Sequence, residues 1–131
     1  MESIMIKVPV TIKAKLTEKL KNRLLDEFGK TIEQLNLEIK QIGIDQQREL
    51  EKNPQHEGQI RRYFGNEIGQ RQQRRDEFTE RKETLEKLAL GAEITQGTLE
   101  REVELKIGDN MREVMNVEVL IEDDKIIAIR G

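Results

Sequence analysis

The sequence predicts an α+β protein, with a long antiparallel two-helix hairpin, similar to a coiled coil, on a small and mainly antiparallel β domain. Apolar residues recur with a period of two near both ends of the chain and with a helical period between them. The two helical stretches are nearly equal in length, so a hairpin returns the chain to its starting point. We therefore expect a β domain formed by residues 1–14 and 91–131, and a helical arm at residues 15–90 that turns near residues 53–57.

The composition favours a large surface and a small core. Charged residues make up 37% of the 131 residues and aromatic residues only 3%, whereas charged residues usually make up ~25%. Long helices produce such a ratio of surface to core. The absence of cysteine excludes disulfides and thiolate chemistry, and one histidine leaves little for zinc chemistry.

The first strand is predicted from strict alternation. Its apolar residues are Ile4, Ile6, Val8, Val10 and Ile12. Pro9 belongs to the opposite face and has no N–H for a ladder hydrogen bond. We therefore expect this strand to lie at an edge of the sheet or to carry a bulge.

The first helix is predicted to begin after Thr17, which suits an N-cap position, and to continue to Lys52. Asn53-Pro54 then ends it. Read as heptads, six consecutive a and d positions are apolar. These are Leu25, Phe28, Ile32, Leu35, Ile39 and Ile42.

The second helix is predicted from Glu57 to Leu90, and Gly91 suits the left-handed residue that follows many helices. Both of its ends carry apolar residues, but residues 69–77 are polar on every face. After this helix the period of two returns. Strands are predicted at residues 99–107 and 117–122 and from Lys125 to Arg130, separated by turns at residues 108–110 and at Asp123-Asp124.

An antiparallel hairpin that turns near Pro54 places residue n of the first helix near residue 109 − n of the second. Three large apolar residues of the first helix then face the polar stretch of the second, although burying each is worth roughly 1.5–3 kcal/mol. Either the register slips so that Ile68 and Phe78 cover them, or a second copy of the first helix does, or the hairpin has a partly polar seam. The second alternative predicts a homo-oligomer that associates through Ile32, Leu35, Ile39 and Ile42.

A cluster of arginines on the second helix is a candidate contact for RNA. Residues 58–75 contain five arginines and one acid, a local charge of +4. The arginines could lie along phosphates, with salt-dependent affinity, and Tyr63 and Phe64 could stack on bases. The competing interpretation is a solvated coiled-coil face whose arginines pair with nearby acids. The candidate residues are Arg61, Arg62, Arg71, Arg74 and Arg75.

Other features carry no predicted chemistry. His56 stands alone in a turn, and Asp123-Asp124 lacks the ligand spacing of a calcium loop. We expect no catalytic residue, cofactor, metal or small-molecule substrate, and hence not an enzyme. The N-terminal segment does not resemble a signal peptide, and no stretch could span a bilayer. We therefore expect a cytoplasmic protein without a membrane partner.

The C-terminal region carries a distinctive pattern in residues 90–109 and 117–131. Its residues are Gly91, Glu93, Ile94, Gly97, Thr98, Glu100, Gly108, Asp109, Ile129 and Arg130. With these residues the region resembles the YlqD family. At the last turn this sequence has Asp123-Asp124 where aspartate-glycine is expected. The family is bacterial, occurring in Firmicutes and cyanobacteria. The resemblance implies no catalytic residue, and the family's function is not characterised. In some members the gene lies near genes for a ribosomal protein and RNA maturation factors.

The sequence therefore favours a non-enzymatic interaction or scaffold protein that self-associates through its helical arm. An RNA- or ribosome-associated factor that uses the arginine-rich second helix is the alternative.

Overall fold

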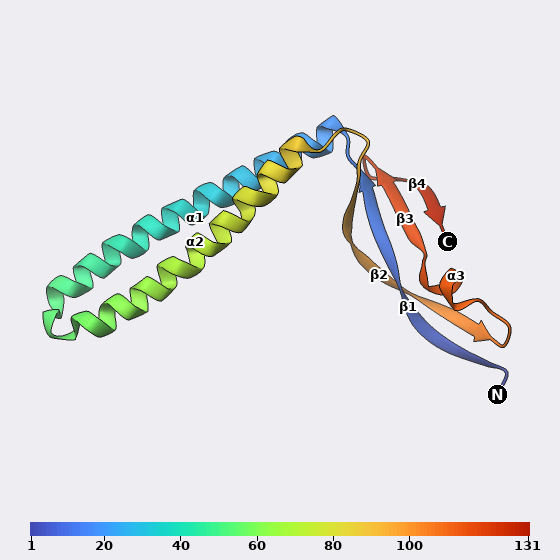
Figure 1. The fold of residues 1–131 in the computed structure, drawn as a ribbon, viewed down its shortest axis with the longest axis horizontal. Helices are drawn as coiled ribbons and strands as arrows, with labels where there is room; N and C mark the ends of the chain where they lie inside the picture. Colours follow the sequence, from blue (N-terminus) through green and yellow to red (C-terminus); the bar gives the residue numbers. More distant parts are fainter. The chain divides into compact units, whose positions relative to one another are not determined.

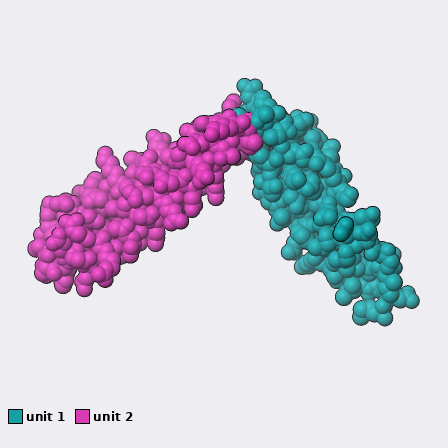
Figure 2. All heavy atoms as spheres, viewed as in Figure 1, with its two compact units in different colours: residues 1–21, 89–131 teal, residues 22–88 magenta.

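The computed structural model describes all residues, 1–131, and confirms the predicted α+β fold (Figure 1). The chain forms two compact units, coloured separately in Figure 2. The sheet unit comprises Met1–Lys21 and Ala89–Gly131, and the arm comprises Asn22–Leu88. In chain order the elements are β1 (Ser3–Lys15), α1 (Glu18–Lys52), the 3₁₀ turn η1 (Pro54–His56), α2 (Glu57–Lys87), β2 (Glu93–Lys106), α3 (Met111–Met115), β3 (Glu118–Glu122) and β4 (Lys125–Arg130).

The four strands form one mixed sheet in the order β2-β1-β3-β4. β1 and β2 pair antiparallel along their whole length, and β3 and β4 form an antiparallel hairpin. β3 pairs parallel with β1 over the short segment from Thr11 to Ala14. The arm, β2 and α3 all lie between β1 and β3 in the sequence, which gives the long connection that parallel neighbours need.

β1 is an inner strand of the sheet, so the edge position expected from Pro9 is wrong. The ladder shifts register between Ile12 and Lys13, where Gln96 of β2 has no partner, so the bulged strand is β2 and not β1. Pro9 itself lies in the half of β1 that pairs only with β2, because β3 reaches no further than Thr11. A residue without an N–H is tolerated there since no second ladder needs its hydrogen bond.

The core of the sheet unit follows the predicted alternation of β1 only in part, because Ile4 on the same face is 54% exposed and Ile6 and Ile12 are half-buried. Val8 and Leu16 are each 1% exposed, and Val10 and Ala14 are also buried, as is Leu120 of β3. The short helix α3 contacts β1, and its first turn is capped by the Asn110 side chain, which accepts hydrogen bonds from two backbone N–H groups. α3 was not predicted, because five residues are too few to show a helical period.

The turn between β3 and β4 places both central residues in the left-handed region. Asp123 has φ 44° and Asp124 has φ 68°. Positive φ at both positions matches the right-handed twist of the flanking strands, and glycine or asparagine adopts it most easily. The Thr17 hydroxyl donates a hydrogen bond of 2.8 Å to the Asp123 carboxylate. This bond holds the Asp123 side chain in position.

The arm is an antiparallel pair of helices, and Figure 1 shows α1 and α2 side by side from the turn at η1 onward. Thr17 acts as the predicted N-cap, because its hydroxyl oxygen accepts a hydrogen bond of 3.2 Å from the Leu20 N–H. α1 ends at Lys52 as predicted. The Asn53 side-chain amide then donates a hydrogen bond of 2.7 Å to Glu49, and Pro54 begins η1.

α2 ends at Lys87, three residues before the predicted end at Leu90. Leu88 already has an extended backbone, and Gly91, with φ 92°, lies in the turn before β2 rather than at the helix end. The reason is sheet pairing. The Gly91 N–H donates to the Leu16 carbonyl at 2.8 Å, and the Leu16 N–H donates to the Ala92 carbonyl at 2.7 Å, which draws this segment away from the helix.

Candidate functional site

Two of the five candidate arginines lie in the seam between α1 and α2. Arg71 hydrogen-bonds the Glu67 carboxylate one turn away, and its Nε lies 3.8 Å from a carboxylate oxygen of Glu38 on α1. Arg75 donates a hydrogen bond of 3.2 Å to the side-chain oxygen of Asn36 on α1. The Arg71 and Arg75 side chains are 32% and 31% exposed. Their guanidinium groups are thus held by partners within the hairpin.

These contacts follow the predicted register, in which residue n lies near residue 109 − n, to within one helical turn. The Phe28 and Phe78 rings also meet across the seam, with 5.9 Å between their centroids. The seam of α2 has a recognisable sequence signal, since Phe64, Arg71, Phe78 and Leu85 follow one another at intervals of seven. A cation in the second of these positions conceals the heptad when only apolar residues are counted.

The four residues predicted to mediate self-association line the α1 side of this seam. Leu35 is only 5% exposed within the single chain, whereas Ile32, Ile39 and Ile42 are half-buried. Arg75 bonds the neighbour of Leu35, and a long arginine side chain can cover apolar surface with its methylene stem while its head stays hydrated. Leu35 is therefore buried although it faces the polar stretch of α2, and the three isoleucines remain partly in water.

The other three candidate arginines, Arg61, Arg62 and Arg74, are exposed. Arg61 pairs with Glu57 one turn away at 2.9 Å, and the Arg74 guanidinium lies 5.9 Å from the Phe78 ring centroid. Tyr63 is 62% exposed. The structure therefore separates the predicted cluster into two seam residues and three surface residues.

Sequence reasoning missed an ion pair that links the outermost strands. Arg130 of β4 bonds both carboxylate oxygens of Glu93 of β2 at 3.0 Å. Its hydrogen bonds lower the pKa of Glu93, and the Glu93 carboxylate raises the pKa of Arg130. Arg130 also lies 3.8 Å from Glu118 of β3, which bonds Lys13 of β1 at 2.8 Å. Glu93 and Arg130 both belong to the C-terminal motif described above, the one sequence signal that could have paired them.

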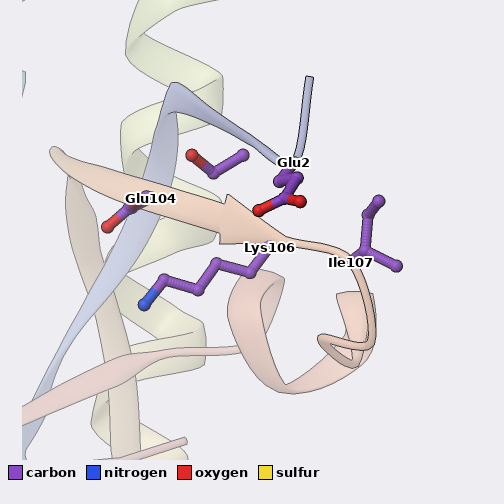
Figure 3. Close-up of a pocket in the computed structure, with 5 residues that line it drawn as sticks. Glu2, Glu104, Lys106 and Ile107 are labelled. Atoms are coloured by element: carbon purple, nitrogen blue, oxygen red, sulfur yellow. The ribbon is translucent and has the colours of Figure 1, made fainter.

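The sheet unit also carries a surface hollow beside the N-terminal segment. This hollow of about 580 Å³ lies where β1 and β2 meet the N-terminal segment, lined by Glu2, Ser3, Glu104, Lys106 and Ile107. Figure 3 shows Glu104 and Lys106 on β2, Ile107 in the loop that follows and Glu2 on the neighbouring N-terminal segment, and these side chains do not converge on one point. No group of three or more histidine, aspartate or glutamate side chains could hold a metal ion, and His56 lies in η1. Neither long helix has an apolar stretch that could cross a membrane.

The geometry defines a class of α+β protein in which a two-helix arm is inserted between the first two strands of a small mixed sheet. A family model described as YlqD protein matches residues 4–130, so the chain belongs to the YlqD family. The comparison with curated proteins gave no match.

The same fold is found in a crystal structure of a protein from Synechococcus sp. WH 8102, which is described as being of unknown function. The TM-score is 0.84, and the match covers 98% of this chain and 95% of that chain, with 20% sequence identity. At this identity the likeness establishes the shared fold and carries no activity.

Proposed function

We propose that the chain is a cytoplasmic, non-enzymatic interaction or scaffold protein whose copies associate through the helical arm. The observation that supports this function is the half-covered apolar stripe of α1, formed by Ile32, Ile39 and Ile42. A two-helix hairpin covers such a stripe from one side only, and packing against a second hairpin gives the four-helix arrangement that covers it fully.

A non-enzymatic role is supported by the chemistry of the surface. Catalytic groups usually lie in concave sites where burial or a charged neighbour shifts their pKa. Here no polar or charged side chain is buried. The groups with shifted pKa values are Lys30, Glu93 and Arg130, and each lies in an exposed ion pair.

An RNA- or ribosome-associated function is the second candidate, now supported by a smaller set of residues. Arg61, Arg62 and Arg74 are exposed on α2, and the exposed Tyr63 ring lies beside two of them in the sequence. Exposed cations next to an aromatic ring suit a single-stranded nucleic acid. Arg71 and Arg75 contribute less to this candidate because their guanidinium groups already have partners in the seam.

Affinity capture from the lysate of a closely related bacterium, at low and at high salt with both RNA and protein measured, tests the choice. Association through apolar surface predicts that the chain retains further copies of itself, or a protein partner, at high salt. Ribosomal RNA or ribosomal proteins retained only at low salt would favour the second candidate, because phosphate contacts weaken steeply with salt.

A matched pair of variants separates the two candidates further. Arg62→Gln combined with Arg74→Gln should weaken RNA binding and flatten its salt dependence if the second candidate holds. Arg23→Gln removes an exposed arginine of α1, 57% exposed, and serves as the control. If the wild type, the double variant and Arg23→Gln bind RNA equally well, Arg62 and Arg74 do not contribute to RNA binding.

A further inference from the structure

α1 carries a second apolar stripe on the side of the helix that faces away from α2. Leu37 is 58% exposed and Ile44 is 40% exposed, and their separation of seven residues places them on the same side of the helix. At 100° per residue, Leu37 lies about 200° around the helix from the buried Leu35. Lys30 and Glu51 lie on the same side of the helix, seven residues before Leu37 and seven residues after Ile44, and both are exposed.

We propose that this outer stripe binds the same stripe of a second copy of the chain in an antiparallel arrangement, with the two-fold axis between residues 40 and 41. This inference rests on the proposed association of copies through the arm, but it places the contact on the outer face of α1 instead of on the half-covered isoleucines, and it adds an orientation and a register. Leu37 then lies opposite Ile44 of the second copy, and Ile44 opposite Leu37. Because each copy contributes the same patch, the interface closes on itself as a dimer.

The charges along α1 favour this arrangement. The antiparallel register places Lys30 opposite Glu51 of the second copy, and Glu33 opposite its Arg48. Opposite charges beside an apolar seam set the orientation and the register of helix pairing. A parallel, in-register arrangement would instead bring Lys30 against Lys30, Arg48 against Arg48 and Glu51 against Glu51.

The bonds that these residues make within one chain are compatible with the interface. Lys30 pairs with Asp26 at 3.0 Å one turn away, and its side chain remains 75% exposed. Glu51 accepts a hydrogen bond of 3.5 Å from Gln47. Both are exposed contacts within one helix, which contribute little to stability and can share a new partner. α2 has no comparable stripe, because its only large apolar side chain with high exposure is Tyr63.

Disulfide trapping tests the register directly, since the chain has no cysteine of its own. The double variant Leu37→Cys/Ile44→Cys should form a covalent dimer under oxidising conditions. Leu37→Cys alone should not, because the two equivalent positions would lie seven residues apart along the helix, about 10 Å, beyond the ~7 Å that a disulfide spans between Cα atoms. Cross-linking of the single variant as readily as the double variant would overturn the antiparallel arrangement.

A charge exchange gives the second test, measured by sedimentation equilibrium. Lys30→Glu and Glu51→Lys should each weaken association by roughly two- to tenfold, and the two substitutions together should restore it. Leu37→Gln should weaken it as well, whereas Leu99→Gln, at a similarly exposed position of the sheet unit (65%), should not. Circular dichroism checks that each variant keeps its helices.

The two proposals can fail separately. If the wild-type chain stays monomeric at tens of micromolar, the proposed self-association fails and this interface fails with it. If the wild-type chain associates but both single charge variants associate equally well, association occurs elsewhere on the chain and only this inference is overturned.

Discussion

The arm and the sheet unit are almost equal in length, but they differ in how many large apolar side chains they leave exposed. Among the large hydrophobic side chains with high exposure, three belong to the arm and eleven to the sheet unit. In the arm, long arginine side chains lie across the seam and bond residues of the facing helix. Within the sheet unit, the single short helix α3 contacts β1. Long polar side chains on a facing helix can therefore replace a hydrophobic partner.

The two regions also use ion pairs differently. In the arm the charged groups lie beside the apolar seam, and their stems contribute to its packing. In the sheet unit Arg130 and Glu93 join the last strand to β2 at an exposed position. We expect substitutions in the arm seam to act mainly through packing, and substitutions at the sheet pair to act mainly through charge.

The largest expected effect comes from the buried residue of the arm. Leu35→Ala should lower the free energy of unfolding by about 2–5 kcal/mol, because it removes a buried side chain and leaves a cavity. Leu37→Ala, two residues away and exposed, should change it by less than about 0.5 kcal/mol. Urea unfolding followed by circular dichroism measures both. Equal effects would mean that the seam does not stabilise the arm.

A pair of substitutions at Arg75 tests whether its stem matters more than its charge. Arg75→Ala should cost about 1 kcal/mol, because Leu35 loses cover. Arg75→Met keeps a long apolar side chain at the same position and should be near neutral or stabilising. Urea unfolding followed by circular dichroism measures the free energy of unfolding of both variants. Equal destabilisation by both variants would show that the hydrogen bond to Asn36 carries the effect, contrary to our interpretation.

The turn of the sheet unit offers a stabilising substitution. Asp124→Gly should raise the free energy of unfolding by a few tenths to about 1 kcal/mol, because glycine adopts positive φ without the steric cost that a side chain brings. Asp123→Gly should gain less, since it also removes the acceptor of the Thr17 hydroxyl. Thermal unfolding of the two variants compares them. A lower melting temperature for Asp124→Gly than for the wild type would contradict the role of backbone strain at this turn.

The smallest expected effect is a pH-dependent change in the melting temperature that comes from the ion pair between Glu93 and Arg130. Arg130 lowers the pKa of Glu93 in the folded state. The pair therefore contributes stability above the ordinary pKa of a glutamate, and this contribution is lost as the pH falls through the lowered folded pKa. Glu93→Gln should melt at a lower temperature than the wild type at neutral pH, and the difference should shrink in acid. A difference that stays constant across this range would assign the effect to something other than the charge of Glu93.

The sequence allowed the fold and the hairpin register to be predicted because their signals are local. Pro54 fixes the end of α1, and Asp123-Asp124 separates two apolar strands. α3 escaped prediction because it is short, and the early end of α2 escaped because pairing with Leu16 decides it. Counting charges could not predict which arginines lie in the seam between the helices and which are exposed. Whether an arginine lies in a seam depends on its heptad position, which Arg71 shares with Phe64 and Phe78.

Sedimentation equilibrium of the intact chain, from low micromolar concentrations upward, tests the central claim most directly. If copies of the chain associate through the arm, the average mass should rise with concentration from the 15.3 kDa of one chain toward the mass of two chains. High salt should weaken the dimer only modestly, because its charge pairs are screened while its apolar contacts remain. A mass of one chain at every concentration would contradict the account.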